Sequence, residues 1–165
     1  MEIKTHADYD ASPDEVFAVI SDPHFVAAKA EQMSVADHAG TVETRGDITL
    51  IASKRTLPTD DLPDIAKKFV GDVLTLLEEQ EWGPSGADGS RQANLRLKIE
   101  GAPVSLRGTI ALAPKGAGST QDLVADLSAK VPLMGGTIEK ASAPAIVAGI
   151  GFEVDMVKEW LAKRA

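Results

Sequence analysis

The longest hydrophobic pattern in the chain covers residues 135–164. Its apolar side chains recur at helical spacing, while polar residues such as Glu139, Asp155 and Glu159 fall on the remaining surface. The pattern predicts one amphipathic helix, about 45 Å long at 1.5 Å per residue. Pro144 lies inside it and predicts a kink near Ala143, because proline removes a backbone donor and clashes with the preceding turn. The apolar positions are Ile138, Ala141, Ala145, Ile146, Phe152, Met156 and Trp160.

Upstream of this helix, alternation of apolar and polar residues predicts strands with one buried face. For residues 35–44 the register is ambiguous, so the pattern does not predict which side chains face the core. In the strand over 48–57, Ile48, Leu50 and Ala52 are expected to face the core, with Thr49, Ser53 and Arg55 toward solvent. The predicted strands cover residues 2–9, 35–44, 48–57, 73–82, 91–99, 104–113 and 121–131.

Three short helices are predicted between these strands. The segment Ser12-Pro13-Asp14-Glu15 has the form of a capping box with proline at the first helical position, which starts a helix over 16–20. Asp22 followed by proline starts a second helix over 24–31. Residues 64–70, followed by glycine, predict a third.

The order of elements predicts an α+β domain spanning residues 1–165, with a strand, two helices, six strands and the long helix. Neighbouring strands joined by short turns are expected to be antiparallel. A ten-residue strand is only about 33 Å long, so a flat sheet would leave part of the longer helix uncovered. We therefore expect a seven-stranded antiparallel sheet that curves round the terminal helix and encloses a cavity.

The opening of the chain carries a family likeness. Residues 9–17 read Tyr-Asp-Ala-Ser-Pro-Asp-Glu-Val-Phe, followed by helix and Asp22. This segment resembles the START-like, or SRPBCC, helix-grip superfamily, which includes birch-pollen-allergen proteins, polyketide cyclases or dehydratases and lipid transport proteins. Other segments resemble one uncharacterised family inside that superfamily, namely residues 62–64 with 69–71, 81–83, 101–109 and 132–140.

The resemblance implies the helix-grip fold and a hydrophobic ligand cavity between the sheet and the terminal helix. The superfamily includes carriers, cyclases, dehydratases, hydrolases and co-chaperone domains. The expected function is binding or transport of a small hydrophobic ligand, such as a lipid, an isoprenoid or a polyketide-like compound. One alternative is an enzyme of the cyclase or dehydratase type that uses the same cavity. Another is a co-chaperone-like interaction module, which would have a filled core and an exposed apolar patch.

Many of the predicted inward positions hold small residues. They either allow helix and sheet to approach closely or leave an apolar cavity of the ~300–1,000 Å³ typical of ligand sites. Aromatic residues are only 4% of the chain, so little bulk is available to fill a gap and we expect a cavity. Its wall is expected to comprise Phe25, Leu50, Leu76, Trp82, Leu95, Leu97, Leu106, Ile110, Phe152 and Met156.

Glu78 is the one candidate for chemistry, and a weak one. It shares a predicted strand face with Leu76 and Trp82, so it points into the cavity if they do. A desolvated carboxylate would have a raised pKa, as a general acid or base requires. The alternative is that Glu78 lies at a bulge or at the cavity mouth, where it meets water or an arginine.

Charge and composition exclude several classes of protein. The net charge is −8, and the basic residues occur singly or in pairs, so nucleic acid and stable membrane insertion are not expected. No cysteine and no signal segment are present in the sequence, which favours the cytoplasm. His6, His24 and His38 fall in different elements, and the glycine runs fit no phosphate loop, so no metal or cofactor is expected. The expected partner is a small hydrophobic molecule, with the chain as a monomer or homodimer.

Overall fold

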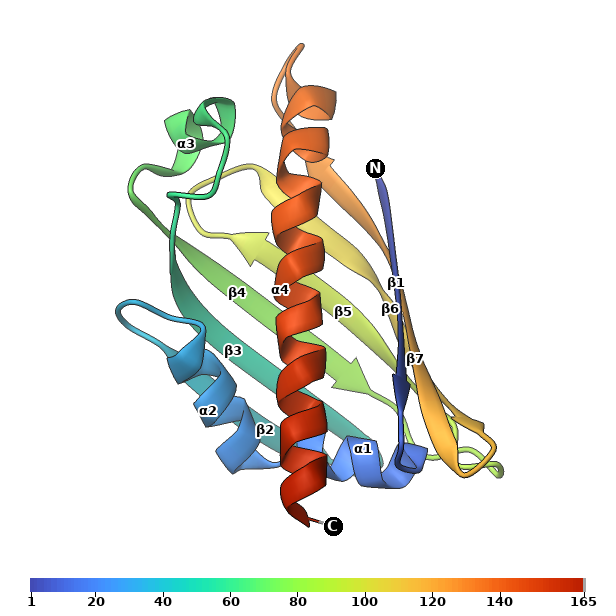
Figure 1. Ribbon diagram of the computed structural model, residues 1–165. Helices are drawn as coiled ribbons and strands as arrows, with labels where there is room; N and C mark the ends of the chain where they lie inside the picture. The colour runs from blue at the N-terminus through green and yellow to red at the C-terminus, as the bar shows by residue number, and fades with distance from the viewer. Residues whose placement is uncertain (165) are drawn as a thin grey trace.

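The computed structural model describes residues 1–164, and its helices and strands follow the predicted order (Figure 1). The strands are β1 (Glu2–Tyr9), β2 (Ala39–Arg45), β3 (Ile48–Pro58), β4 (Val73–Trp82), β5 (Arg91–Ile99), β6 (Val104–Lys115) and β7 (Gly118–Ala129). The helices are α1 (Pro13–Ile20), α2 (Pro23–Gln32), α3 (Asp64–Val70) and α4 (Gly135–Arg164). The largest boundary error is at β2, which was predicted from residue 35 and begins at Ala39.

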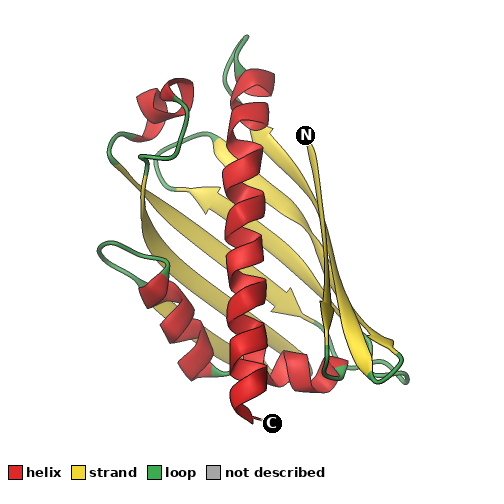
Figure 2. Ribbon diagram, in the orientation of Figure 1, coloured by secondary structure: helices red, strands yellow, loops and turns green. Residues whose placement is uncertain are grey.

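The seven strands form one antiparallel sheet in the order β1-β7-β6-β5-β4-β3-β2. Six strands follow each other as a meander, and the first strand joins the last, so β1 and β2 are the two edges. Figure 2 shows α4 crossing one face of this sheet, with α1 and α2 on the same side. The predicted α+β class, with a seven-stranded sheet against a long terminal helix, is confirmed.

The short helices begin where the capping residues predict. The Ser12 hydroxyl accepts a 3.2 Å hydrogen bond from the Glu15 amide, and the Glu15 carboxylate accepts one of 3.3 Å from the Ser12 amide. The Asp22 carboxylate accepts a 2.8 Å bond from the His24 amide at the start of α2. These bonds satisfy amides that a helix start leaves unpaired. Both helices are thereby placed at one end of α4.

The core lies between α4 and the inner face of the sheet. Trp82 is fully buried, and its ring meets Phe17 edge to face at 5.5 Å between centroids. Phe25 of α2 meets Trp160 of α4 in the same manner at 5.3 Å. The alternation predicted for β1, β4, β5, β6 and β7 agrees with which side chains are buried. Aromatic pairs therefore anchor the last turns of α4 and the adjoining part of the sheet.

The long helix continues through Pro144 without interruption. Its buried side chains lie toward its two ends and leave a half-buried middle, since the buried residues are Ile138, Ala143, Met156 and Val157. Between them, the middle of the helix faces the sheet with Ala145, Ile146, Gly149 and Ile150. This middle segment is where helix and sheet leave space.

The predicted facing of β3 is wrong. Its register with β4 places Ile51 opposite Gln80, Ser53 opposite Glu78 and Arg55 opposite Leu76, all on the inner face. Leu50 and Ala52 therefore lie on the outer face. Both faces of β3 carry apolar residues, so periodicity within the strand was ambiguous, and pairing with the clearly two-faced β4 decided the orientation.

Gly40 allows α2 to pack closely on β2. A Cβ at Gly40 would lie 2.7 Å from Val26 Cγ1 and 2.9 Å from the Val26 carbonyl oxygen. A side chain there would push α2 away from the sheet. The close approach brings Lys29, which is on the buried face of α2 together with Phe25 and Val26, over the inner face of the sheet.

Candidate functional site

A cavity of about 110 Å³ lies between the middle of α4 and the inner face of the sheet. Its wall is mostly apolar from both sides. The sheet contributes Leu57, Leu76, Trp82, Leu95, Leu97, Leu106, Ile110 and Leu123, and α4 contributes Ala145, Ile146, Gly149 and Ile150. Its volume is well below the ~300–1,000 Å³ of common ligand sites, because leucine side chains from the sheet fill much of the space that the small residues leave.

Six of the ten predicted wall residues meet at this cavity. All six belong to β4, β5 and β6, where alternation of apolar and polar residues predicted the inward face. They are Leu76, Trp82, Leu95, Leu97, Leu106 and Ile110.

The other four predicted wall residues lie elsewhere. Phe25 and Met156 are buried in the adjoining hydrophobic core, outside the residues that line the cavity. Leu50 is on the outer face of β3, for the reason given above. Phe152 is 46% exposed and does not line the cavity. Helical spacing alone did not distinguish the cavity face from its flanks.

A buried charge cluster forms the polar end of the cavity. Glu78 points inward, where Arg55 Nη2 donates to its Oε2 at 2.6 Å and Lys29 Nζ donates to its Oε1 at 3.1 Å. Lys29 Nζ also lies 3.1 Å from Oε1 of Glu153 on α4. Four elements thus meet here, because the residues come from α2, β3, β4 and α4. The cluster contains two cations and two carboxylates.

Two neutral side chains extend this cluster along β4. Gln80 Nε2 donates to Glu78 Oε1 at 2.7 Å, and Trp82 Nε1 donates to Gln80 Oε1 at 2.9 Å. Glu78, Gln80 and Trp82 alternate along one strand face. These hydrogen bonds give partners to the Trp82 indole N–H and to the Gln80 side-chain amide, in a region with little access to water.

The cluster holds Glu78 in its ionised form. Burial alone would raise its pKa, but the charges of Lys29 and Arg55, with the Gln80 hydrogen bond, lower that pKa well below its ordinary value. Burial likewise opposes the charged form of Lys29, yet Glu153 and Glu78 raise the Lys29 pKa. The raised pKa expected for an inward Glu78 is therefore wrong. A carboxylate with these partners is a poor proton donor at neutral pH.

Sequence reasoning missed Lys29, Arg55 and Glu153. Lys29 lies one turn beyond Phe25 and Val26, so helical spacing could have placed it on the buried face of α2. Arg55 was assigned to solvent with the wrong face of β3. The alternative stated for Glu78, that it meets an arginine, describes its contact with Arg55, although Glu78 lies inside the sheet and not at a bulge.

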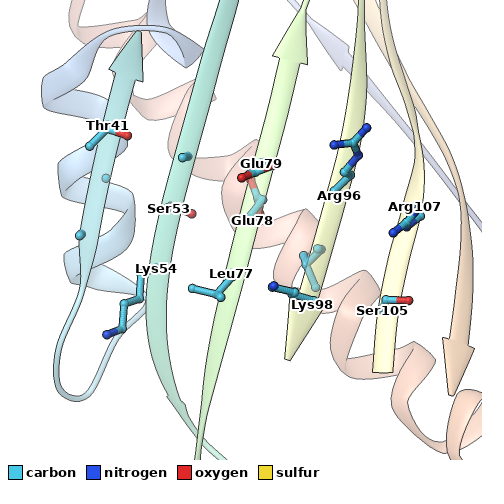
Figure 3. Close-up of a pocket in the computed structure, with 14 residues that line it drawn as sticks. Thr41, Ser53, Lys54, Leu77, Glu78, Glu79, Arg96, Lys98, Ser105 and Arg107 are labelled. Carbon is cyan, nitrogen blue, oxygen red and sulfur yellow. The ribbon is translucent and has the colours of Figure 1, made fainter. Parts of the chain in front are cut away.

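A second hollow, of about 500 Å³, lies on the outer face of the sheet. Figure 3 shows Lys54, Arg96, Lys98 and Arg107 on this face, with α4 behind the strands. The fold thus gathers basic residues that are scattered in the sequence. In register, however, Arg96 is opposite Glu79 and Arg107 is opposite Asp126, so carboxylates flank both arginines. The inner cavity is the stronger candidate because it is apolar and bounded by two layers.

Across residues 1–164, no group of three or more His, Cys, Asp or Glu side chains is arranged to hold a metal ion. None of the helices described by the structure is long and apolar enough to cross a membrane.

Solved structures share this architecture. An aromatase/cyclase, Zhui, from Streptomyces sp. R1128 superposes with a TM-score of 0.65 at 11% identity, covering 99% of this chain and 94% of that one. A STAR-related lipid transfer protein from Xanthomonas axonopodis gives a TM-score of 0.63 at 13% identity, covering 98% and 85%. At these identities the likeness concerns the fold.

A long terminal helix held against a curved antiparallel sheet gives this protein the START-like, or SRPBCC, helix-grip fold, as the resemblance implied. Residues 4–161 match the model of the family described as protein of unknown function (DUF2505), and the chain belongs to that family. A relative in Mycobacterium tuberculosis (strain ATCC 25618 / H37Rv), the uncharacterized protein Rv0481c, is 26% identical over 146 residues, 81% of each chain.

Proposed function

We propose that this protein binds a small apolar molecule in the cavity between α4 and the sheet. The observation that carries the proposal is the two-sided apolar wall, with Leu95, Leu106 and Ile110 facing Ile146 and Ile150 across the space. Apolar surface released from water is the main source of affinity for such a ligand. The lipid-transfer and cyclase proteins that share the fold support this assignment.

The cavity volume limits the ligand. At about 110 Å³, the space suits a short aliphatic or a small ring compound. A lipid or polyketide would require the middle of α4 to move outward. That segment contains Gly149, and Met33 Cε lies 4.0 Å from where a Cβ on Gly149 would be. Methionine is flexible and repacks easily, so displacement of Met33 is the simplest way to enlarge the cavity.

The test is a binding assay on the folded chain with three neutral probes: hexanol, geraniol and naphthalene. Because Trp82 lines the cavity and Trp160 packs on Phe25 outside it, a Trp160→Phe variant reports on Trp82 fluorescence alone. We expect saturable fluorescence change and a raised melting temperature with at least one probe. No saturable response to any of the three would contradict the proposal.

Two variants on α4 provide a matched control. Gly149 lines the cavity, whereas Gly151 does not, and a Cβ at Gly151 meets nothing within 4 Å. Gly149→Leu should fill the space and abolish binding, while Gly151→Leu should bind as the wild type does. Equal binding by both variants would place the ligand elsewhere.

A second function, cyclase or dehydratase chemistry, is favoured by one observation. Several polar groups converge at one end of the apolar cavity, as an active site requires. However, Glu78 is held ionised by two cations, so proton transfer would need another group. Loss of turnover in Glu78→Gln, with binding retained, would support an enzyme once a substrate is found. Unchanged turnover would remove Glu78 from any mechanism.

A further inference from the structure

Arg55 has more hydrogen-bond donors than the protein supplies acceptors. The residue is only 3% exposed and lines the cavity. Its Nη2 donates to Glu78, but its Nη1 donates at 3.2 Å to the thioether sulfur of Met33, which is a weak acceptor. Its buried Nε has no hydrogen-bond partner among residues 1–164. Most buried side-chain donors in proteins are satisfied, so this guanidinium is an exception to explain.

The most deeply buried part of the charge cluster is positive. The side chains of Lys29, Arg55 and Glu78 are 2%, 4% and 7% exposed, and together they carry one net positive charge. Glu153, whose side chain is 22% exposed, pairs with Lys29 at 3.1 Å and lines the cavity, so the cluster of four residues is neutral. Gln80 donates one of its two amide hydrogens to Glu78 and carries no charge. Arg55 is therefore the cation of the cluster that keeps an unused donor.

We infer that the ligand of this cavity is an aliphatic carboxylate whose two oxygens bind Arg55. This inference rests on the proposed function and specifies the polar group of its ligand. One carboxylate oxygen accepts from Nε and the other from the second hydrogen of Nη2, which lies on the same edge of the guanidinium. The hydrocarbon chain extends along the leucines of β5 and β6. A planar guanidinium matches the two oxygens of a carboxylate, and charge-assisted bonds of this kind are stronger than neutral ones.

Met33 is suited to be displaced. It caps the C-terminal end of α2 and is half-buried, and its side chain spans from Arg55 toward Gly149 of α4. Displacing it enlarges the cavity beside Arg55 without breaking the bond between Arg55 and Glu78.

The experiment compares hexanoate with hexanol, which has a similar chain but no charge, by calorimetry at neutral pH. We expect hexanoate to bind about tenfold more tightly than hexanol. Arg55→Lys retains a cation for Glu78 but loses the planar fork, so it should remove this preference and keep hexanol binding. Met33→Leu leaves the Nε and Nη2 edge of Arg55 unchanged and should bind hexanoate as tightly as wild type does.

A spectroscopic measurement on the unmodified chain covers the case in which Arg55→Lys does not fold. The Arg55 Nε–H resonance should move on saturation with hexanoate and remain in place with hexanol. The carboxylate inference would be overturned if the two probes bound with equal affinity, or if the Nε–H resonance did not move on addition of hexanoate. The apolar-ligand proposal would still stand in either case. If neither hexanoate nor any neutral probe binds, both proposals fail.

Discussion

Arg55 on β3 donates a 2.6 Å hydrogen bond to Glu78 on β4, although the residue registered opposite Glu78 is Ser53. The ion pair is thus diagonal across two neighbouring strands, a separation that a long arginine side chain spans easily. Lys29 joins the same carboxylate from α2. The Arg55–Glu78 pair joins β3 to β4, and Lys29 joins this pair to α2. These three residues therefore link the sheet to the helices that pack on it.

Removing the Glu78 charge should destabilise the fold. Glu78→Gln leaves Lys29 and Arg55 buried with less compensation, and breaking a buried ion pair typically costs about 3–5 kcal/mol. Glutamine can still accept hydrogen bonds, so we expect a loss of about 3 kcal/mol in the free energy of unfolding. Chemical denaturation measures it. The control is Glu79→Gln on the exposed outer face, with an expected change within about 0.5 kcal/mol. Equal losses in the two variants would contradict the role of the cluster.

The same carboxylate makes stability depend on acidity. Because the folded-state pKa of Glu78 is lowered from its ordinary 4.5, its contribution is fully present above about pH 4.5 and is lost as the pH falls through the folded value. Lys29 has a raised pKa, so its contribution is lost only above its ordinary 10.5. The stability gap between wild type and Glu78→Gln should therefore narrow on acidification below pH 4.5. A gap that is constant from pH 7 to pH 3 in urea titrations would refute this.

His6 should titrate above the ordinary value for histidine. Its Nδ1 lies 2.7 Å from Oδ1 of Asp122, and this hydrogen bond, with the charges of Asp122 and Asp8, raises the His6 pKa from 6.5. The contribution of the His6–Asp122 pair to stability is therefore fully present below pH 6.5. It is lost as the pH rises through the pKa of His6 in the folded protein. Imidazole NMR titration measures this. Asp122→Asn should lower the pKa toward 6.5, while Asp126→Asn should leave it unchanged.

Two glycines should respond oppositely to alanine. A Cβ at Gly108 would collide with the Val124 carbonyl oxygen and lie 2.5 Å from Ala125 Cα, so Gly108→Ala should cost about 3 kcal/mol in unfolding free energy. At Gly151 of α4 the space is open, and Gly151→Ala should gain up to about 1 kcal/mol from helix propensity. Thermal unfolding of both variants tests the pair. A stable Gly108→Ala protein would mean that β6 and β7 are less closely paired than described.

The sequence alone determined the class of fold and six apolar residues of the cavity wall. In β4, β5 and β6, most apolar residues fall at alternate positions, and a strand places alternate side chains on opposite faces. The inward positions of Leu76, Leu95 and Ile110 could therefore be read directly. The long amphipathic stripe of α4 required a partner sheet, which made the overall arrangement predictable.

Tertiary structure decided the polar end of the site. Lys29, Arg55, Glu78 and Glu153 come from four elements, and no local pattern relates them. The face of β3 was undetermined within the strand because both sides carry apolar residues, and only its register with β4 turned Arg55 inward. The sequence thus determines a periodicity of 2 or 3.6 residues, whereas long-range pairing determines which charges meet. The cavity, its volume and its unsatisfied arginine follow from that pairing.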